Sequence, residues 1–173
     1  VVNRLPPLSL ATSAPLARLG LKGRDAATLL QDAGIALPAR ANAVVHAPSA
    51  DSISRCLRLG TSEFIIEDDA DSSRIANIAL KASAGALRAV IAPRSDYSAV
   101  LSGPAVFDSL SPFCAYDFAA LQAQPDTVVM TLLADISVVL ALEPGGNLSP
   151  RLRLWADPGY GLYLTETLTG EHR

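Results

Sequence analysis

The first half of the chain alternates between short apolar runs and polar segments that contain glycine or proline. The run at residues 16–21 is followed by Gly23 and predicts a strand that ends in a turn. Residues 24–33 carry apolar positions at helical spacing, and Gly34 follows them as a stop signal. Asp68, Asp69 and Asp71 precede a second helical pattern, where acidic residues suit the helix dipole. The remaining elements of this half are predicted as a loop at residues 35–52 with a short strand at 43–46, a hairpin of strands 53–59 and 63–67, a helix at 72–83 and a strand at 87–92.

The second half repeats this order. The segment LGLKGRDA at residues 19–26 aligns with AVLSGPAV at residues 99–106, which places Gly103 where the first half has Gly23. Residues 127–142 predict two buried strands that meet at a bend or tight turn near Asp135. A strand at 151–155 follows, and Asp157-Pro158 is expected to open a last helix with Tyr160, Tyr163, Leu164 and Leu168 on one face.

A β-α-β-β-α order therefore occurs twice, at about residues 16–93 and 96–169. Two such halves predict an α+β fold with mostly antiparallel sheets and helices on one face of each. We expect residues 16–173 to form one domain. Residues 1–15 are rich in proline, serine and alanine and are expected to be an extended arm that either lies across a partner or frays.

The amino-acid composition favours a protein that binds other chains. The chain of 173 residues is 50% hydrophobic and 18% charged, with a mean hydropathy of +0.29. This balance predicts a folded protein, part of whose apolar surface is covered by other chains. The net charge is −3, aromatic residues make up 5% of the sequence, and the arginines form no basic stripe, so nucleic acid is not an expected partner.

The longest apolar stretch, residues 127–142, is shorter than the roughly 20 residues that a spanning helix needs. It also has Asp135 at its centre, which is costly inside a membrane. No secretory pattern opens the chain at Val1. We therefore expect a cytoplasmic protein without a membrane anchor, in which Cys56 and Cys114 are buried and reduced.

Residues suited to nucleophilic catalysis are few. Ser102 lacks the preceding glycine of a nucleophile elbow, and His172 is next to the C-terminus. His46 could pair with Cys56, although an ordinary loop histidine and a buried thiol are the simpler interpretation. These residues do not predict a catalytic dyad or triad.

Phosphate and metal sites are not predicted either. Residues 20–23, GLKG, match neither the dinucleotide nor the P-loop pattern, and the glycine recurs at Gly103 without the lysine, which favours a strand-to-helix turn. The acidic group at Glu67, Asp68, Asp69 and Asp71 lacks the alternate spacing of a calcium loop and is interpreted as a solvated hairpin end and helix cap. Asp135 is interpreted as a turn residue whose carboxylate accepts backbone hydrogen bonds. We expect no catalytic, cofactor-binding or metal-binding residues.

Three segments carry a family resemblance. Residues 59–66 read LGTSEFII, similar to an L-G-P-D-E-F-L-L hairpin, and residues 99–105 read AVLSGPA, similar to a strand-G-P-A-helix segment. Residues 131–140 read TLLADISVVL, similar to T-x-L-A-x-I-x-V-x-L. In this order, over about residues 17–168, the chain resembles the gamma subunit of heterotetrameric sarcosine oxidase. That family is related to the folate-binding fold of aminomethyltransferase, the T-protein of glycine cleavage.

The resemblance implies a subunit without a cofactor of its own. FAD, FMN, NAD and tetrahydrofolate would sit on larger alpha and beta subunits. The complex would oxidise an N-methyl amine such as sarcosine and transfer the one-carbon unit to folate. The PPLSL segment of the arm and the helix with Tyr160 and Tyr163 are the candidate contacts with the larger chains.

Other assignments stay open. Asp157-Pro158-Gly159-Tyr160 stands where the family often has D-R-S-[FY], so a related complex, such as an N-methylglutamate dehydrogenase, is an alternative. A stand-alone folate-binding protein or aminomethyltransferase-like enzyme is a second alternative, and a small thiol enzyme or esterase that uses Cys56 and His46 is a third.

Overall fold

The computed structural model describes residues 8–13, 16–46, 54–85, 87–144 and 149–170, and it divides the chain into two compact units. The N-terminal unit comprises Ala14–Ser95, and the C-terminal unit comprises Asp96–Arg173 together with Val1–Ser13. No helix among the described residues has the length and apolar character needed to cross a membrane.

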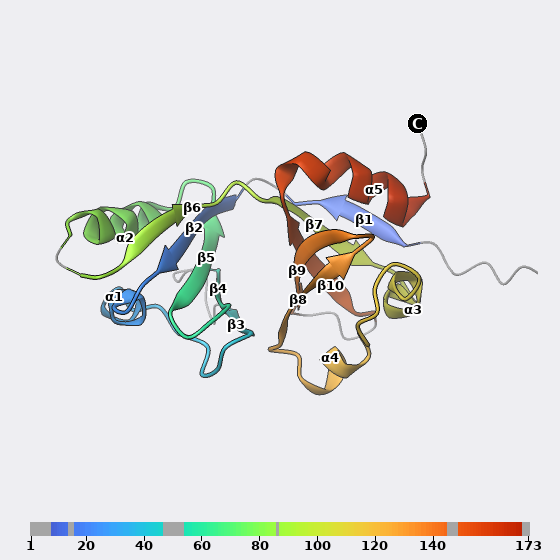
Figure 1. Cartoon of the computed structure of the whole chain (residues 1–173), viewed down its shortest axis with the longest axis horizontal. Coiled ribbons are helices and arrows are strands. Elements are labelled where there is room, and N and C mark those ends of the chain that lie inside the picture. The colour runs from blue at the N-terminus through green and yellow to red at the C-terminus, as the bar shows by residue number, and fades with distance from the viewer. Residues whose placement is uncertain (1–7, 14–15, 47–53, 86, 145–148, 171–173) are drawn as a thin grey trace, which may run out of the picture. The chain divides into compact units, whose positions relative to one another are not determined.

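In the N-terminal unit, a five-stranded antiparallel sheet has the order β3-β4-β5-β2-β6 (Figure 1). Its elements along the chain are β2 (Leu16–Lys22), α1 (Ala26–Asp32), β3 (Ala43–His46), β4 (Arg55–Arg58), β5 (Glu63–Asp69), α2 (Ser73–Ser83) and β6 (Val90–Pro93). Leu30 of α1 and Ile78 of α2 pack with Leu21, Phe64 and Ile66 of the sheet in one buried cluster. The helices therefore cover one face of this sheet, as the apolar stripes predict.

In the C-terminal unit, the sheet order is β1-β7-β10-β9-β8, again antiparallel throughout. Its elements are β1 (Ser9–Thr12), β7 (Tyr97–Ser102), α3 (Val106–Leu110), α4 (Ala120–Ala123), β8 (Val128–Leu133), β9 (Ile136–Leu142), β10 (Arg151–Ala156), the 3₁₀ helix η1 (Pro158–Tyr160) and α5 (Gly161–Thr169). Leu110 of α3 and Leu164 of α5 pack with Leu101, Leu140 and Leu154 of the strands.

The two sheets have the same topology when β2 is matched with β7, β5 with β10, β4 with β9 and β3 with β8. The predicted α+β class with two similar, mostly antiparallel halves is confirmed. The short helix α4 was not predicted. The last strand of the N-terminal unit begins at Val90 rather than at residue 87, because the backbone of Arg88 is hydrogen-bonded to Asp25 at the start of α1.

Two expectations need correction. Residues 9–12, expected to belong to an extended arm, form β1 and pair with β7 because Leu8 and Leu10 find apolar partners in the core of the C-terminal unit. Tyr160 and Tyr163, expected on the same face as Leu164, are 47% and 46% exposed whereas Leu164 is buried. Tyr160 belongs to the 3₁₀ turn Pro158–Tyr160, which breaks the helical spacing before α5. Tyr163 is inside α5, but it is one residue from Leu164 and so lies about 100° around the helix from the buried face.

Candidate functional site

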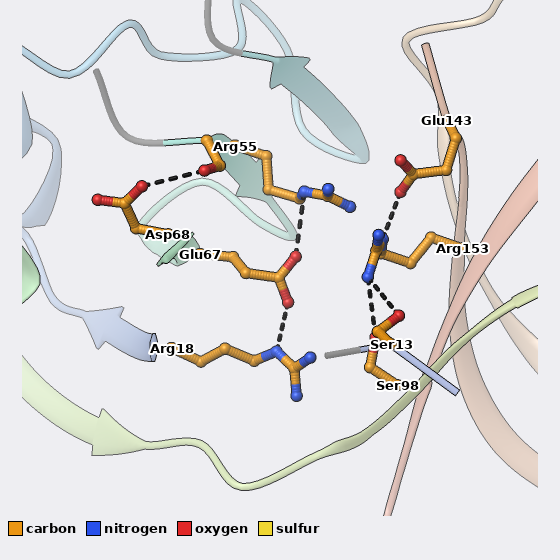
Figure 2. A network of polar contacts seen from close by, with 9 residues as sticks. Ser13, Arg18, Arg55, Glu67, Asp68, Ser98, Glu143 and Arg153 are labelled. Carbon is orange, nitrogen blue, oxygen red and sulfur yellow. Dashed lines mark hydrogen bonds and ion pairs between the residues drawn. The ribbon is translucent and has the colours of Figure 1, made fainter. Parts of the chain in front are cut away.

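Among the described residues of the N-terminal unit, the most deeply buried charged group is Glu67 of β5, whose side chain is 0% exposed. Arg18 lies directly opposite Glu67 on β2, and Arg55 lies directly opposite on β4. Arg18 Nε donates to Glu67 Oε1, and Arg55 Nε lies 3.0 Å from Glu67 Oε2 (Figure 2). The two arginine side chains are only 7% and 9% exposed, so the three charged side chains on these neighbouring strands are almost fully shielded from solvent.

This arrangement, the Arg18–Glu67–Arg55 triad, engages both carboxylate oxygens with guanidinium groups. A buried ion pair tolerates its loss of hydration only where the charges are compensated and hydrogen-bonded. Arg18 meets this condition with a hydrogen bond to Glu67, whereas the Arg55 contact with Glu67 is an ion pair. Because the three residues lie directly opposite one another, the triad fits a role in fixing the register of β2, β5 and β4. Sequence reasoning missed it, because Glu67 was grouped with the solvated acids and the arginines were considered only as forming no basic stripe.

The neighbouring carboxylate, Asp68, is also buried but belongs to a second cluster. Ser54 Oγ donates to Asp68 Oδ1 at 3.0 Å, Arg74 Nη2 lies 2.8 Å from Asp68 Oδ2, and the Ser72 hydroxyl donates to the same oxygen. Burial acts to raise the pKa of Asp68, but the hydrogen bonds from Ser72, Ser54, the Asp69 backbone and Arg74 outweigh it, so this pKa lies below its ordinary value.

The Asp68 cluster orders the start of α2. Ser72 is the N-cap residue, and its side chain accepts a hydrogen bond from the backbone N–H of Ile75. The predicted role of a helix cap is thus taken by this cluster, with Asp69 and Asp71 exposed beside it. Residues 69–74 line a shallow surface hollow of about 450 Å³, formed by the loop and the first turn of the helix alone.

The C-terminal unit has its own buried charge, Arg153 of β10 (Figure 2). Arg153 Nε donates to Glu143 Oε1, and its Nη1 donates to the hydroxyls of Ser13 at 2.7 Å and Ser98 at 3.3 Å. Both charged side chains are 10% exposed. This cluster joins the end of β1 to β7, β10 and the residue that follows β9.

The alternative in which His46 pairs with Cys56 is excluded, and the simpler interpretation of Cys56 as a buried thiol is confirmed. His46 lies opposite Arg55 on the neighbouring strand, whereas Cys56 lies opposite Val45. Because successive side chains in a strand point to opposite faces, Cys56 enters the core under the helices while His46 is on the other face. Burial raises the pKa of the Cys56 thiol to about 12, so it is not a thiolate nucleophile at neutral pH.

The backbone conformation explains why glycine occurs at both strand-to-helix turns. Gly23 has φ +133° and Gly103 has φ +153°, both outside the usual range for other residues. A Cβ at Gly23 would lie 2.2 Å from the carbonyl oxygen of Arg88, which requires glycine here. The Gly23 N–H, which a phosphate-binding loop would point at its ligand, donates to the carbonyl of Ser62 at 3.0 Å. Lys22 of the same motif pairs with Glu63 at 2.8 Å on the surface.

The remaining candidates also have local roles. Ala134 and Asp135 both have positive φ in the two-residue turn between β8 and β9, which confirms the predicted turn. Cys56 and Cys114 are both free and buried, as expected. Ser102 is the last residue of β7, and His172 lies outside the described residues. Within the described ranges, no three His, Cys, Asp or Glu side chains are grouped so that they could hold a metal ion.

Solved structures identify the fold. A chain of the heterotetrameric sarcosine oxidase from Corynebacterium sp. U-96, in complex with pyrrole 2-carboxylate, matches with a TM-score of 0.74 and 22% identity over 94% of this chain and 82% of that chain. The glycine cleavage system aminomethyltransferase T from Bartonella henselae matches with a TM-score of 0.65 and 14% identity. That match covers 96% of this chain but only 46% of the transferase. The shared property is the fold.

No protein-family model and no curated protein matches the sequence. The oxidase chain and the transferase are related here by fold alone, because the identities of 22% and 14% are too low to carry residue roles across. The fold that the resemblance in the sequence implied is nevertheless the one found.

Proposed function

We propose that this chain is the gamma-type subunit of a sarcosine oxidase-type complex and that it has no catalytic site of its own. The observation that carries this proposal is the match with the oxidase chain, which spans 94% of this chain and 82% of the other. The two polypeptides are thus alike in extent as well as in fold. The transferase match leaves more than half of the transferase without a counterpart.

The placement of the candidate chemical groups supports a structural role. Glu67 is held between two arginines, Asp68 supports a helix cap, and Cys56 is a protonated core thiol. In this proposal, FAD, FMN, NAD and tetrahydrofolate belong to larger alpha and beta subunits. The complex would demethylate sarcosine or another N-methyl amino acid and transfer the one-carbon unit to tetrahydrofolate there.

Exposed apolar side chains at the start of α5 support a contact with a larger subunit. Tyr160 is 47% exposed, Leu162 67% and Tyr163 46%, and we call these three residues the α5 surface. Neighbouring exposed aromatic and aliphatic side chains are typical of sites that a partner covers. The PPLSL segment is a weaker candidate than expected, because Ser9 and Leu10 are part of β1.

The experiment is to purify the tagged full chain from its native cells and measure flavin absorbance and sarcosine-dependent oxygen uptake. The proposal expects two larger chains, flavin and activity in the same fraction. Leu162→Asp should lose this association without unfolding the chain. Leu80→Asp, at a leucine that is 70% exposed on α2 of the other unit, is the matched control and should keep it. Elution of the wild-type chain alone and without activity would overturn the proposal.

A second candidate function, a folate-binding or aminomethyltransferase-like protein, is favoured by the TM-score of 0.65 with the transferase. The two candidates differ in what the purified chain does alone. Titration with tetrahydrofolate, followed by calorimetry, should show no saturable binding if the chain is a gamma-type subunit. Micromolar binding by the isolated chain would favour the second candidate.

A further inference from the structure

In each unit, the equivalent edge of the sheet is paired with a further strand, but the two strands come from different parts of the chain. In the N-terminal unit, β6 follows α2 and pairs with β2, with Ala92 opposite Gly20 and Ile91 opposite Leu21. In the C-terminal unit, the described residues after α5 form no such strand. The corresponding edge, that of β7, is occupied by β1 instead.

The correspondence holds residue by residue. Leu10 lies opposite Leu101 and Ala11 lies opposite Val100, so that β1 matches β6 at the positions of Ile91 and Ala92. Both edge strands have four residues and run antiparallel to their neighbours. The C-terminal unit thus receives from the start of the chain the strand that the N-terminal unit makes from its own continuation.

Three kinds of contact hold β1 in place. Its backbone continues the ladder beyond the strand, since the N–H of Ser13 donates to the carbonyl of Ser98 at 2.9 Å. The side chains of Leu8 and Leu10 pack against the apolar core of the unit. The hydroxyl of Ser13 accepts a hydrogen bond from the buried Arg153. Figure 1 shows β1 beside β7 and next to α5, with which it is in contact.

We propose that the β7 edge is a strand-acceptor site for an extended peptide with apolar side chains at alternate positions, and that residues 8–13 of the same chain are its normal occupant. Recognition would rest on backbone hydrogen bonds, which accept many sequences, on two apolar side chains that enter the core, and on the Arg153 contact at one end. Without an occupant, β7 becomes an edge strand with unpaired N–H and C=O groups beside an open core.

This proposal differs from the arm expected from the sequence. From the sequence, residues 1–15 were expected either to lie across a partner or to fray. Here, residues 8–13 complete the chain's own second unit. The proposal is independent of the oxidase function, since it concerns only how the C-terminal unit is closed.

The test uses the full chain with one proline in β1. The pair Ser13–Ser98 is hydrogen-bonded, so the alternation of an antiparallel ladder makes Ala11–Val100 the next such pair. Ala11→Pro removes that donor and should release β1. Ala92→Pro, at the corresponding position of β6, is the matched control. Amide hydrogen exchange by mass spectrometry then reports the strands of each unit separately.

We expect Ala11→Pro to speed exchange in β7 and leave β5 of the other unit protected, and Ala92→Pro to speed exchange in β2 but not in β7. Adding the free peptide Leu-Ser-Leu-Ala-Thr-Ser should restore protection of β7 in Ala11→Pro. The peptide is needed at a concentration on the order of millimolar, because a short tether gives the chain's own strand an effective concentration of that size. It should not restore β2 in Ala92→Pro.

A milder variant covers the case in which proline unfolds the whole chain. Ser13→Ala deletes the hydrogen bonds that the Ser13 hydroxyl accepts from Arg153 at 2.7 Å and from Ser98 at 3.4 Å, and it should speed exchange of the β1 amides by about tenfold, as expected for loss of a hydrogen bond to a charged group. Unchanged β7 protection in Ala11→Pro, unchanged β1 exchange in Ser13→Ala, or no effect of the peptide would overturn the proposal. Wild-type protection that depends on protein concentration would also overturn it, because the strand would then come from a second copy.

Discussion

Replacing Glu67 by glutamine keeps the shape of the side chain and removes only its charge. The carboxylate is 0% exposed, and Arg18 and Arg55 are 7% and 9% exposed, so the variant removes the buried negative charge that both guanidinium groups contact. Removing one partner of a buried ion pair typically costs about 3–5 kcal/mol, because the remaining charge has lost its hydration and its partner. We therefore expect Glu67→Gln to lower the free energy of unfolding by about 3–5 kcal/mol.

Glu63→Gln is the matched control, since Glu63 is on the same strand and pairs with Lys22 on the surface, where the two side chains are 35% and 58% exposed. An exposed pair contributes about 0–1 kcal/mol, so this variant should change the free energy of unfolding by less than about 1 kcal/mol. Urea titrations followed by far-UV circular dichroism measure both variants. Equal midpoints for Glu67→Gln and Glu63→Gln would refute the assignment of the triad as a buried, mutually dependent set of charges.

Three further predictions concern the same chain. The pKa of Asp68 is lowered in the folded state, so its carboxylate stabilises the fold above the unfolded pKa of about 3.8 and loses this effect as the pH falls through the folded pKa. The stability deficit of Asp68→Asn, from urea titrations at several pH values, should accordingly be largest near neutral pH and shrink in acid; a constant deficit would contradict this. Gly23→Ala should destabilise the chain by more than the roughly 1–2 kcal/mol expected for Gly34→Ala, because both glycines have positive φ but only Gly23 lies against a backbone carbonyl; equal melting temperatures would contradict the steric argument. Cys56 should react with a thiol reagent only after denaturation, since its thiol is buried with a pKa of about 12, and peptide mapping that finds it modified at the rate of an exposed thiol would show this to be wrong.

Local sequence patterns were sufficient to predict most of the helices and strands. Gly60-Thr61-Ser62 between two apolar runs predicted the hairpin of β4 and β5, and Ala134-Asp135 predicted the turn between β8 and β9. Such signals depend on residues close in the sequence. The place of β1 depends on pairing between residues 9–12 and 99–102, which no local periodicity reports. A proline-rich beginning is typical of an arm, and the tertiary contacts of Leu8 and Leu10 override that signal.

The polar clusters were harder to predict for a related reason. Arg18, Arg55 and Glu67 are far apart in the sequence, and their relation appears only when the register of three strands is known. One signal was present for Arg18, which is the only charge in the apolar run at residues 16–21, and a buried charge requires a partner. Glu67 directly follows an apolar run but opens a run of three acidic residues, which favoured a solvated interpretation. The same register excludes the His46–Cys56 pair, since the period of two in a strand separates their side chains.

The central claim, that this chain is a subunit and the reaction belongs to its partners, is tested most directly by native mass spectrometry of the assembly purified from its own cells. The account predicts a hetero-oligomer that contains the 18.0 kDa chain together with larger, flavin-carrying chains, and a released 18.0 kDa chain with no added flavin mass. A flavin that leaves with the 18.0 kDa chain, or a chain found only as a monomer that oxidises sarcosine by itself, would contradict it.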